Sequence, residues 1–83
     1  METVTVVGNI CESGDKLAQD RTLPSIRVGD ILGIMDAGAY GYSMSYQYNG
    51  RLRPAEVLVN GKEHYLIRER ENIDDLTRNV TVP

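Results

Sequence analysis

With 83 residues, the chain makes at most one small domain, at the lower edge of what folds alone. Twelve acidic residues outnumber nine basic ones, and the net charge of −3 disfavours nucleic acid or an anionic membrane as the main partner, because both attract a basic patch. No apolar run approaches the roughly 20 residues of a membrane span. One cysteine and one histidine allow no internal disulfide and no zinc site, so we expect a cytoplasmic protein without a metal.

The first half of the sequence predicts two strands separated by a turn and a loop. Residues 3–7 alternate hydroxyl and β-branched side chains, which is typical of a strand with one buried face, and the chain starts in the middle of this pattern. Residues 11–15 predict a tight polar turn. The charged residues 16–23 predict a loop that ends at Pro24. Residues 31–35 are the most apolar run and favour a fully buried strand.

The second half predicts a loop, a hairpin and a short helix. Residues 42–50 have no apolar period and indicate a long ordered loop. An Asn-Gly pair at 60–61 separates the apolar-rich arms 55–59 and 62–68, which predicts a β-hairpin with a type I′ turn. Asn72, with an aspartate three residues later, is typical of a helix N-cap.

Together these elements predict an all-β (mainly β) fold with a short C-terminal helix. Four or five strands favour a small β-sandwich or open barrel with exposed strand edges. The chain has no Trp and no Phe, so its core has to come from aliphatic residues and five tyrosines. In so short a chain, burial of aliphatic groups only narrowly exceeds the ordering entropy. We therefore expect another chain or domain to supply part of the stability.

The sequence Cys11-Glu12-Ser13-Gly14-Asp15 is the first candidate site. It presents a thiol and a carboxylate side by side on a loop at the end of a strand. An ordinary thiol is mostly protonated at neutral pH and can donate a proton to a carbanion, and the carboxylate can hold an ammonium group. The alternative is a buried cysteine followed by an Asp/Ser turn, which is the commoner case for such a pentapeptide taken alone.

The sequence Asp36-Ala37-Gly38-Ala39-Tyr40-Gly41 is the second candidate site. Small residues let backbone N–H groups approach an anion, and a phenol is a good neutral donor to phosphate. A turn with a packed tyrosine explains the same residues equally well. His64 lies in the second arm of the predicted hairpin and fits an ordinary strand residue better than a catalyst.

Taken in register, these segments resemble a known family. The turn at 11–15, the segment 36–41, Ser43-Met44, Tyr48-Asn49 and Arg53-Pro54-Ala55-Glu56-Val57 occur in the order seen in the C-terminal part of the diaminopimelate decarboxylase family. These are pyridoxal-phosphate (PLP) enzymes of the alanine-racemase-like fold, fold type III. The resemblance runs from Val6 to about Leu76.

The resemblance implies roles for three residues. Cys11 matches the cysteine that returns a proton to the substrate α-carbon after CO₂ leaves. Glu12 matches the carboxylate that contacts substrate, and both residues serve the active site of the neighbouring subunit in a homodimer. Tyr40 matches the tyrosine that contacts substrate and the PLP phosphate within its own subunit. The full enzyme converts the small molecule meso-2,6-diaminopimelate into L-lysine and CO₂ in lysine biosynthesis.

The resemblance also implies what the chain lacks. The family carries its Schiff-base lysine on an upstream TIM-type barrel, and neither Lys16 nor Lys62 matches that lysine. We therefore expect residues 1–83 to be a partial C-terminal β-domain that is inactive alone. The arginines that grip substrate carboxylates also lie upstream in this family, so Arg51 and Arg53 are not expected in that role.

Two other interpretations remain open from the sequence. The chain can be a free-standing β-rich module that binds a partner without catalysis. It can also be a fragment of a sister PLP decarboxylase that acts on another basic amino acid. The glutamate after Cys11, where ornithine-type enzymes tend to carry aspartate, argues against this last interpretation.

Overall fold

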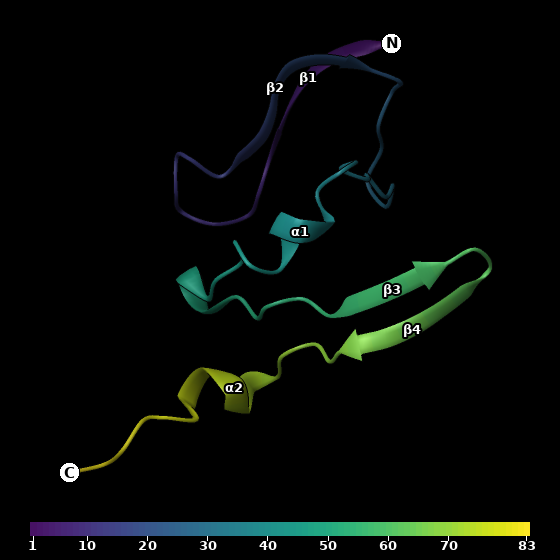
Figure 1. Cartoon of the computed structure of the whole chain (residues 1–83). Helices are drawn as coiled ribbons and strands as arrows, with labels where there is room; N and C mark the ends of the chain where they lie inside the picture. The colour runs from purple at the N-terminus through teal and green to yellow at the C-terminus, as the bar shows by residue number, and fades with distance from the viewer. The chain divides into compact units, whose positions relative to one another are not determined.

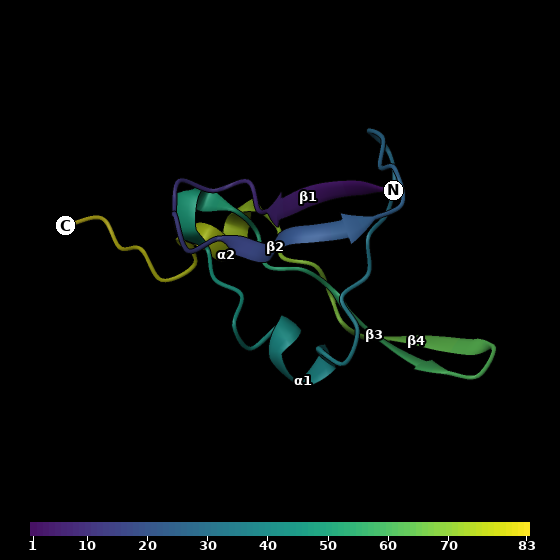
Figure 2. The same ribbon diagram turned by 90° about the horizontal axis from the view of Figure 1, so that it is seen from above.

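The computed structural model describes residues 1–83 and divides them into two compact units, residues 1–34 and 35–83 (Figures 1 and 2). Each unit contains one two-stranded antiparallel sheet. None of the helices combines the length and the apolar character that a membrane crossing requires. The predicted mainly β class with a short C-terminal helix is confirmed.

In the first unit, strands β1 (Glu2–Val7) and β2 (Lys16–Leu23) pair with Glu2 opposite Leu23. The predicted alternation of β1 is confirmed, because Val4 and Val6 are half-buried whereas Thr3 and Thr5 are exposed. Such alternation is the period-2 pattern of a strand with one covered face. Figure 1 shows the two strands side by side, joined by the connection of residues 8–15.

The prediction of a loop at residues 16–23 is wrong, because this segment is strand β2. The charged composition of this segment does not indicate a strand. The strand forms because its backbone groups pair with those of β1. A β-bulge interrupts the pairing, since Val4 opposite Arg21 is followed by Val6 opposite Ala18. At the bulge Asp20 adopts a left-handed φ of 51°, and its N–H donates to Thr5 Oγ1 at 3.2 Å.

The prediction of a buried strand at residues 31–35 is also wrong. The segment contains no strand, and Ile31 is 95% exposed. Apolar composition alone cannot make a strand, because the backbone N–H and C=O groups need a partner to pair with. No strand of the first unit pairs with this segment, because β1 and β2 pair with each other.

The second unit begins with two short helical turns, α1 (Gly38–Gly41) and η1 (Tyr48–Gly50). The predicted ordered loop therefore contains local structure. Asn49 (φ 62°) and Gly50 (φ 69°) are both left-handed, and Arg51 N donates to Tyr48 O at 3.4 Å. Two positive φ values at the centre of a turn define the type I′ geometry. This turn uses the first of the two Asn-Gly pairs in the sequence.

The predicted hairpin is confirmed as β3 (Glu56–Asn60) and β4 (Glu63–Arg68), but its turn is displaced by one residue. Asn60 pairs with Glu63, so Gly61 and Lys62 form the two-residue loop. Only Gly61 has a positive φ, 62°, which fits a type II′ turn with glycine at its first central position. The expected type I′ turn at the Asn-Gly pair is therefore wrong in type.

The C-terminal helix α2 (Ile73–Thr77) starts where the sequence predicts it. Asn72 Oδ1 accepts from Asp75 N at 3.3 Å, and Asn72 N donates to Asp75 Oδ2 at 2.8 Å. These reciprocal bonds form a capping box, which satisfies N–H groups that the first helical turn leaves without partners. The N-cap prediction is confirmed.

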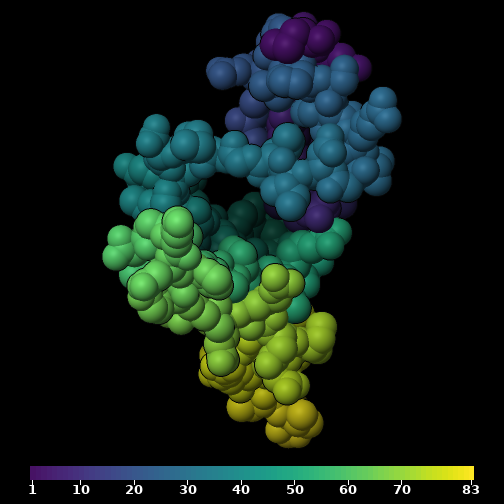
Figure 3. Space-filling model, turned by 90° about the vertical axis from the view of Figure 1, so that its right-hand side faces the viewer, coloured from purple at the N-terminus to yellow at the C-terminus, as the bar shows by residue number.

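No residue of the chain is buried, and the structure contains no hydrophobic core. Many large apolar side chains are exposed, among them Leu66 and Ile67 on the β3–β4 hairpin, which Figure 3 shows in green. A small domain that leaves this many large apolar side chains uncovered gains little stability from their burial. The burial pattern is thus in line with the expectation that another chain or domain supplies part of the stability.

Candidate active site

The connection between β1 and β2 holds the first pair of candidate residues. Asp15 N donates to Glu12 O at 3.0 Å and closes a four-residue turn with Ser13 and Gly14 at its centre. Gly8 N donates to Asp15 O at 3.0 Å and ties the two ends of the connection together. The predicted tight polar turn is therefore confirmed.

Asp15 also fixes this connection through its side chain. Its Oδ2 accepts a long hydrogen bond of 3.4 Å from Ile10 N. The carboxylate lies so close to Gly8 that a Cβ at this position would be 1.9 Å from Oδ2. Only glycine leaves room for this approach, so Gly8 and Asp15 together set the path of the chain on either side of Cys11.

Cys11 and Glu12 lie next to each other on this connection, and both are exposed. The Glu12 carboxylate folds toward Gly14, where an added Cβ would be 2.6 Å from Glu12 Oε2. Cys11 and Glu12 therefore follow one another on a connection whose backbone is hydrogen-bonded. This placement suits groups that act on a ligand, since both are accessible while the backbone that carries them is hydrogen-bonded.

Tyr40 lies in α1, in the second unit. The helical turn forms when Tyr40 N and Gly41 N both donate to Ala37 O, at 3.0 and 2.9 Å. Asp36, just before it, has a left-handed φ of 56°, which turns the chain into the helix. Tyr40 is 64% exposed, so its phenol is available to a ligand.

The other tyrosines of this region do not share one strand face, because residues 42–50 form a loop with a short helical turn. Tyr46 and Tyr48 contact each other edge to face, with ring centroids 6.0 Å apart. His64 lies exposed in β4 opposite Val59, as expected for a strand residue.

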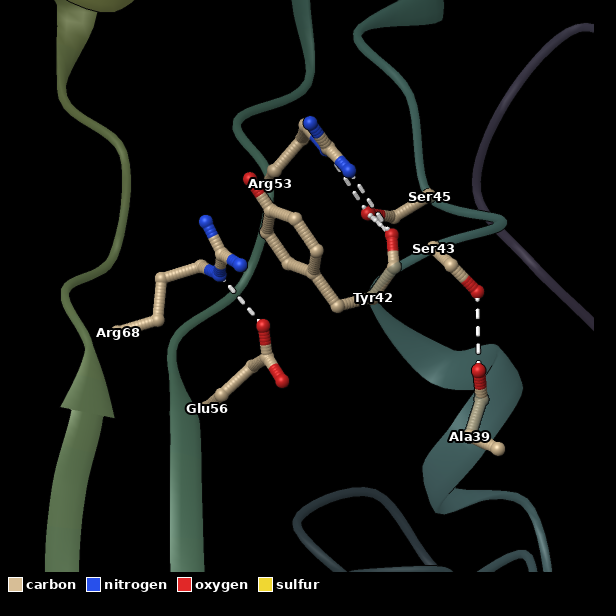
Figure 4. Close-up of polar contacts among 7 residues, drawn as sticks. All are labelled: Ala39, Tyr42, Ser43, Ser45, Arg53, Glu56 and Arg68. Carbon is tan, nitrogen blue, oxygen red and sulfur yellow. Dashed lines mark hydrogen bonds and ion pairs between the residues drawn. The ribbon is translucent and has the colours of Figure 1, made fainter.

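Sequence reasoning missed a polar cluster around Tyr42, which Figure 4 shows in part. The cluster joins the loop after α1 to β3, β4 and the segment before α2, and most of its members are half-buried. The signal in the sequence is weak, because the contacts join residues far apart in the chain. We call it the Tyr42 cluster, and it comprises Tyr42, Ser45, Gln47, Arg53, Glu56, Arg68 and Glu71.

Two groups of this cluster have shifted pKa values. Glu71 Oε1 accepts from Gln47 Nε2 at 3.0 Å and from Arg53 N at 2.7 Å, and these bonds hold the pKa of the Glu71 carboxyl below its ordinary value. The Glu56 carboxylate, 2.5 Å from Arg68 Nε, raises the pKa of Arg68. Both pKa shifts favour the charged form of the group.

The candidate residues form no metal site and do not line the surface hollow of the first unit. No group of three or more His, Cys, Asp or Glu side chains could hold a metal ion. One hollow of about 280 Å³ occurs in the first unit and includes none of the candidate residues. Its lining consists of Leu23, Pro24, Ser25, Ile26, Asp30, Ile31 and Leu32.

Comparison with known proteins shows which class of domain this chain resembles. The family described as "Pyridoxal-dependent decarboxylase, C-terminal sheet domain" matches residues 1–38, which include β1, β2 and the Cys11 turn. A crystal structure of diaminopimelate decarboxylase from Methanocaldococcus jannaschii superposes with a TM-score of 0.91 at 49% identity, over 99% of this chain and 19% of that one. The chain therefore matches the C-terminal sheet domain of pyridoxal-dependent decarboxylases, in sequence over residues 1–38 and in fold over nearly its whole length.

The individual relatives are diaminopimelate decarboxylases. The enzyme of Archaeoglobus fulgidus is 57% identical over 82 residues, which cover 99% of this chain and 20% of that protein. The enzyme of Methanothermobacter thermautotrophicus is also 57% identical over 82 residues, which cover 19% of its length. The chain spans about a fifth of the length of the curated relatives it matches.

Proposed function

We propose that residues 1–83 are part of the C-terminal sheet domain of a diaminopimelate decarboxylase. In lysine biosynthesis the whole enzyme converts meso-2,6-diaminopimelate into L-lysine and CO₂. The observation that carries this proposal is the 57% identity over 82 residues to the Archaeoglobus fulgidus enzyme. The exposed Cys11–Glu12 pair on a fixed turn supports it, because it places an acid and a carboxylate where a substrate can reach them.

Cys11 is the proton donor in this proposal. When the bond between the α-carbon and the carboxyl group breaks, CO₂ leaves and the electron pair stays on the α-carbon. The Cys11 Sγ–H proton then transfers to that carbon, and the thiolate recovers a proton from water. The neighbouring Glu12 carboxylate orients the substrate by accepting hydrogen bonds from its ammonium group.

Tyr40 is the cofactor contact within its own subunit. Its exposed phenol is a neutral donor, which fits a phosphate oxygen of PLP, and it also contacts substrate. PLP supplies the electron sink for the charge left on the α-carbon. The resemblance to the family implies that the lysine that holds PLP lies on an upstream barrel, and neither Lys16 in β2 nor Lys62 in the hairpin turn takes that role in this proposal.

The partner of this chain in the proposal is a second subunit of the same enzyme. Cys11 and Glu12 complete the active site of the neighbouring subunit of a homodimer. The exposed apolar side chains agree with a segment that other parts of a larger protein cover. The acidic net charge is in keeping with a cytoplasmic enzyme that acts on a small molecule and binds neither nucleic acid nor membrane.

The proposal is tested by grafting. In the grafted enzyme, this chain replaces the aligned 82-residue segment of the Archaeoglobus fulgidus decarboxylase. We expect the grafted enzyme to release CO₂ from meso-diaminopimelate but not from ornithine. A folded, PLP-loaded graft that is inactive on diaminopimelate would contradict the proposal, and a preference for ornithine would favour the sister enzyme.

A variant of the grafted enzyme tests the role of Cys11. Cys11→Ala removes the proton donor but no contact to PLP, so we expect turnover to fall by about 10²-fold or more, while the affinity for PLP is retained. Cys11→Ser is the matched control for side-chain volume, and it should remain slow because a hydroxyl is a far weaker acid. Loss of PLP from Cys11→Ala would contradict the proton-donor role.

A further inference from the structure

The ring of Tyr42 lies between two guanidinium groups. Arg53 Cζ is 3.7 Å and Arg68 Cζ is 4.0 Å from the ring centroid. Two planar groups at these distances cannot share one face of the ring, so they occupy opposite faces, as Figure 4 shows. Each face of an aromatic ring attracts a cation, and the half-buried ring strengthens this attraction relative to a fully exposed one.

Each guanidinium group is fixed by partners outside the ring. Arg53 Nε donates to Ser45 Oγ at 3.0 Å, and Arg53 Nη2 donates to Tyr42 O at 3.0 Å. The Arg53 backbone N–H is bound to the Glu71 carboxylate. Arg68 Nε donates to Glu56 Oε1 at 2.5 Å. The two arginines are therefore held in place, and Tyr42 is held between them.

Tyr42 follows directly after α1, the helical turn that carries Tyr40. α1 has four residues, too few to be stable from its own hydrogen bonds. Its C-terminal end is tied down in three ways: Tyr42 O accepts from Arg53, Met44 N donates to Tyr40 O at 3.1 Å, and Ser43 Oγ donates to Ala39 O at 3.0 Å. Fixing Tyr42 thus fixes the backbone of Tyr40.

We propose that Tyr42, Arg53 and Arg68 are positioning residues for the Tyr40 phenol. This inference rests on the proposed function, in which Tyr40 contacts substrate and the PLP phosphate. In this proposal the arginines act on the ring and its surroundings: Arg53 donates to a hydroxyl and a carbonyl, and Arg68 donates to a carboxylate. They hold the phenol where its contact is productive, because errors of about 1 Å in a contacting group weaken its action.

The contact itself is tested by NMR on the grafted enzyme, with isotope-labelled arginine. Protons that lie over an aromatic face move upfield, so we expect upfield shifts of the δ-methylene protons of Arg53 and Arg68. Tyr42→Leu should abolish both shifts, and Tyr42→Phe should keep them because the ring remains. Tyr65→Leu is the matched control, since it removes a ring from β4 outside the cluster and should leave the shifts in place. Absence of the shifts in the unmodified, PLP-loaded graft would overturn the proposal.

The positioning role is tested in the grafted enzyme by a double-mutant cycle. We expect Tyr42→Leu to weaken PLP binding, measured by titration of its absorbance, by about 5- to 10-fold, and Tyr42→Phe to recover most of that loss. In a Tyr40→Phe background, Tyr42→Leu should have almost no further effect, because the hydroxyl that it positions is already gone. Arg53→Ala should behave in the same way.

The two proposals fail in different ways. If the unmodified graft binds PLP but does not decarboxylate diaminopimelate, the proposed function fails. If the graft is active and Tyr42→Leu weakens PLP binding equally with and without the Tyr40 hydroxyl, the cluster only stabilises the fold and the positioning role is wrong. An active graft in which Tyr42→Leu changes nothing also overturns the positioning role.

Discussion

The close approach of Gly8 to Asp15 allows the stability of the Cys11 turn to be tested. In Gly8→Ala, the new Cβ would lie 1.9 Å from Asp15 Oδ2 and 2.3 Å from its Cγ, so the carboxylate has to rotate away. Rotation breaks the bond from Ile10 N, which removes about 1 kcal/mol. Alanine lowers the entropy of the unfolded chain, which stabilises the folded turn by about 0.5 kcal/mol. This gain is available because Gly8 has no positive φ that would strain an alanine. The net loss is about 0.5 kcal/mol.

In an Asp15→Ala background the same substitution meets no carboxylate. Gly8→Ala should then stabilise the turn by about 0.5 kcal/mol, so the effect changes sign. The coupling between the two positions is about 1 kcal/mol, or about fivefold in the opening equilibrium. Hydrogen exchange of the Lys16 amide, which donates to Gly14 O at 2.8 Å, reports this opening after correction for intrinsic rates.

The control is Gly33→Ala, also in the first unit, where an added Cβ meets nothing within 4 Å and the φ is not positive. It should leave exchange of the Lys16 amide unchanged. If Gly8→Ala has the same effect with and without the Asp15 carboxylate, the close packing of this turn is refuted. Slower turnover of Gly8→Ala in the grafted enzyme is expected as well, since the displaced turn carries Cys11.

Three further predictions concern the second unit. Asn72→Ala should destabilise α2 by about 1 kcal/mol, with Asn72→Asp retaining most of the cap, as measured by hydrogen exchange of the Asp75 amide. Gly61→Ala places a side chain at a φ of 62° and should lower the stability of the β3–β4 hairpin by about 1 kcal/mol, whereas Gly38→Ala, at an open helical position, should not. The bonds from Gln47 and the Arg53 backbone lower the pKa of Glu71, so its contribution is complete above the ordinary value of 4.5 and is lost as the pH falls through the lower, folded value. The free energies of unfolding of wild type and Glu71→Gln, measured against pH, should therefore converge below pH 4.5. A difference between them that grows as the pH falls would contradict the lowered pKa of Glu71.

Local signals account for the parts of the fold that the sequence predicts correctly. The alternation in β1, the apolar arms of the hairpin and the Asn72 cap each depend on residues close together in the chain. The predictions for segments 16–23 and 31–35 are wrong because strand formation depends on a pairing partner. The charged segment has β1 beside it, whereas the apolar segment has no partner within its unit.

The turn of the hairpin shows how similar local signals compete. Two Asn-Gly pairs occur, and the type I′ geometry falls on Asn49-Gly50 rather than on Asn60-Gly61. The pairing of Asn60 with Glu63 moves the second turn forward by one residue, so that Gly61 takes the first central position. The register of the strands therefore decides the turn type, and the dipeptide alone does not.

In the candidate site, too, residues of short motifs can be identified from the sequence, whereas contacts between distant residues cannot. Cys11, Glu12 and Tyr40 were identified from short motifs in register, and the structure places all three on exposed, hydrogen-bonded segments. The Tyr42 cluster could not be identified in this way, because Tyr42, Arg53 and Arg68 meet only after the hairpin forms. Its members look in the sequence like ordinary surface arginines and a loop tyrosine.

The most direct test of the account mixes two impaired forms of the grafted enzyme, Cys11→Ala and Tyr40→Ala. If Cys11 serves the neighbouring subunit's site and Tyr40 serves its own, a mixed dimer contains one site with both residues intact. Random exchange of subunits should then restore roughly a quarter of the unmodified graft's rate of CO₂ release from diaminopimelate. If the mixture after exchange is no more active than the average of its two parents, the shared active site proposed for this chain is contradicted.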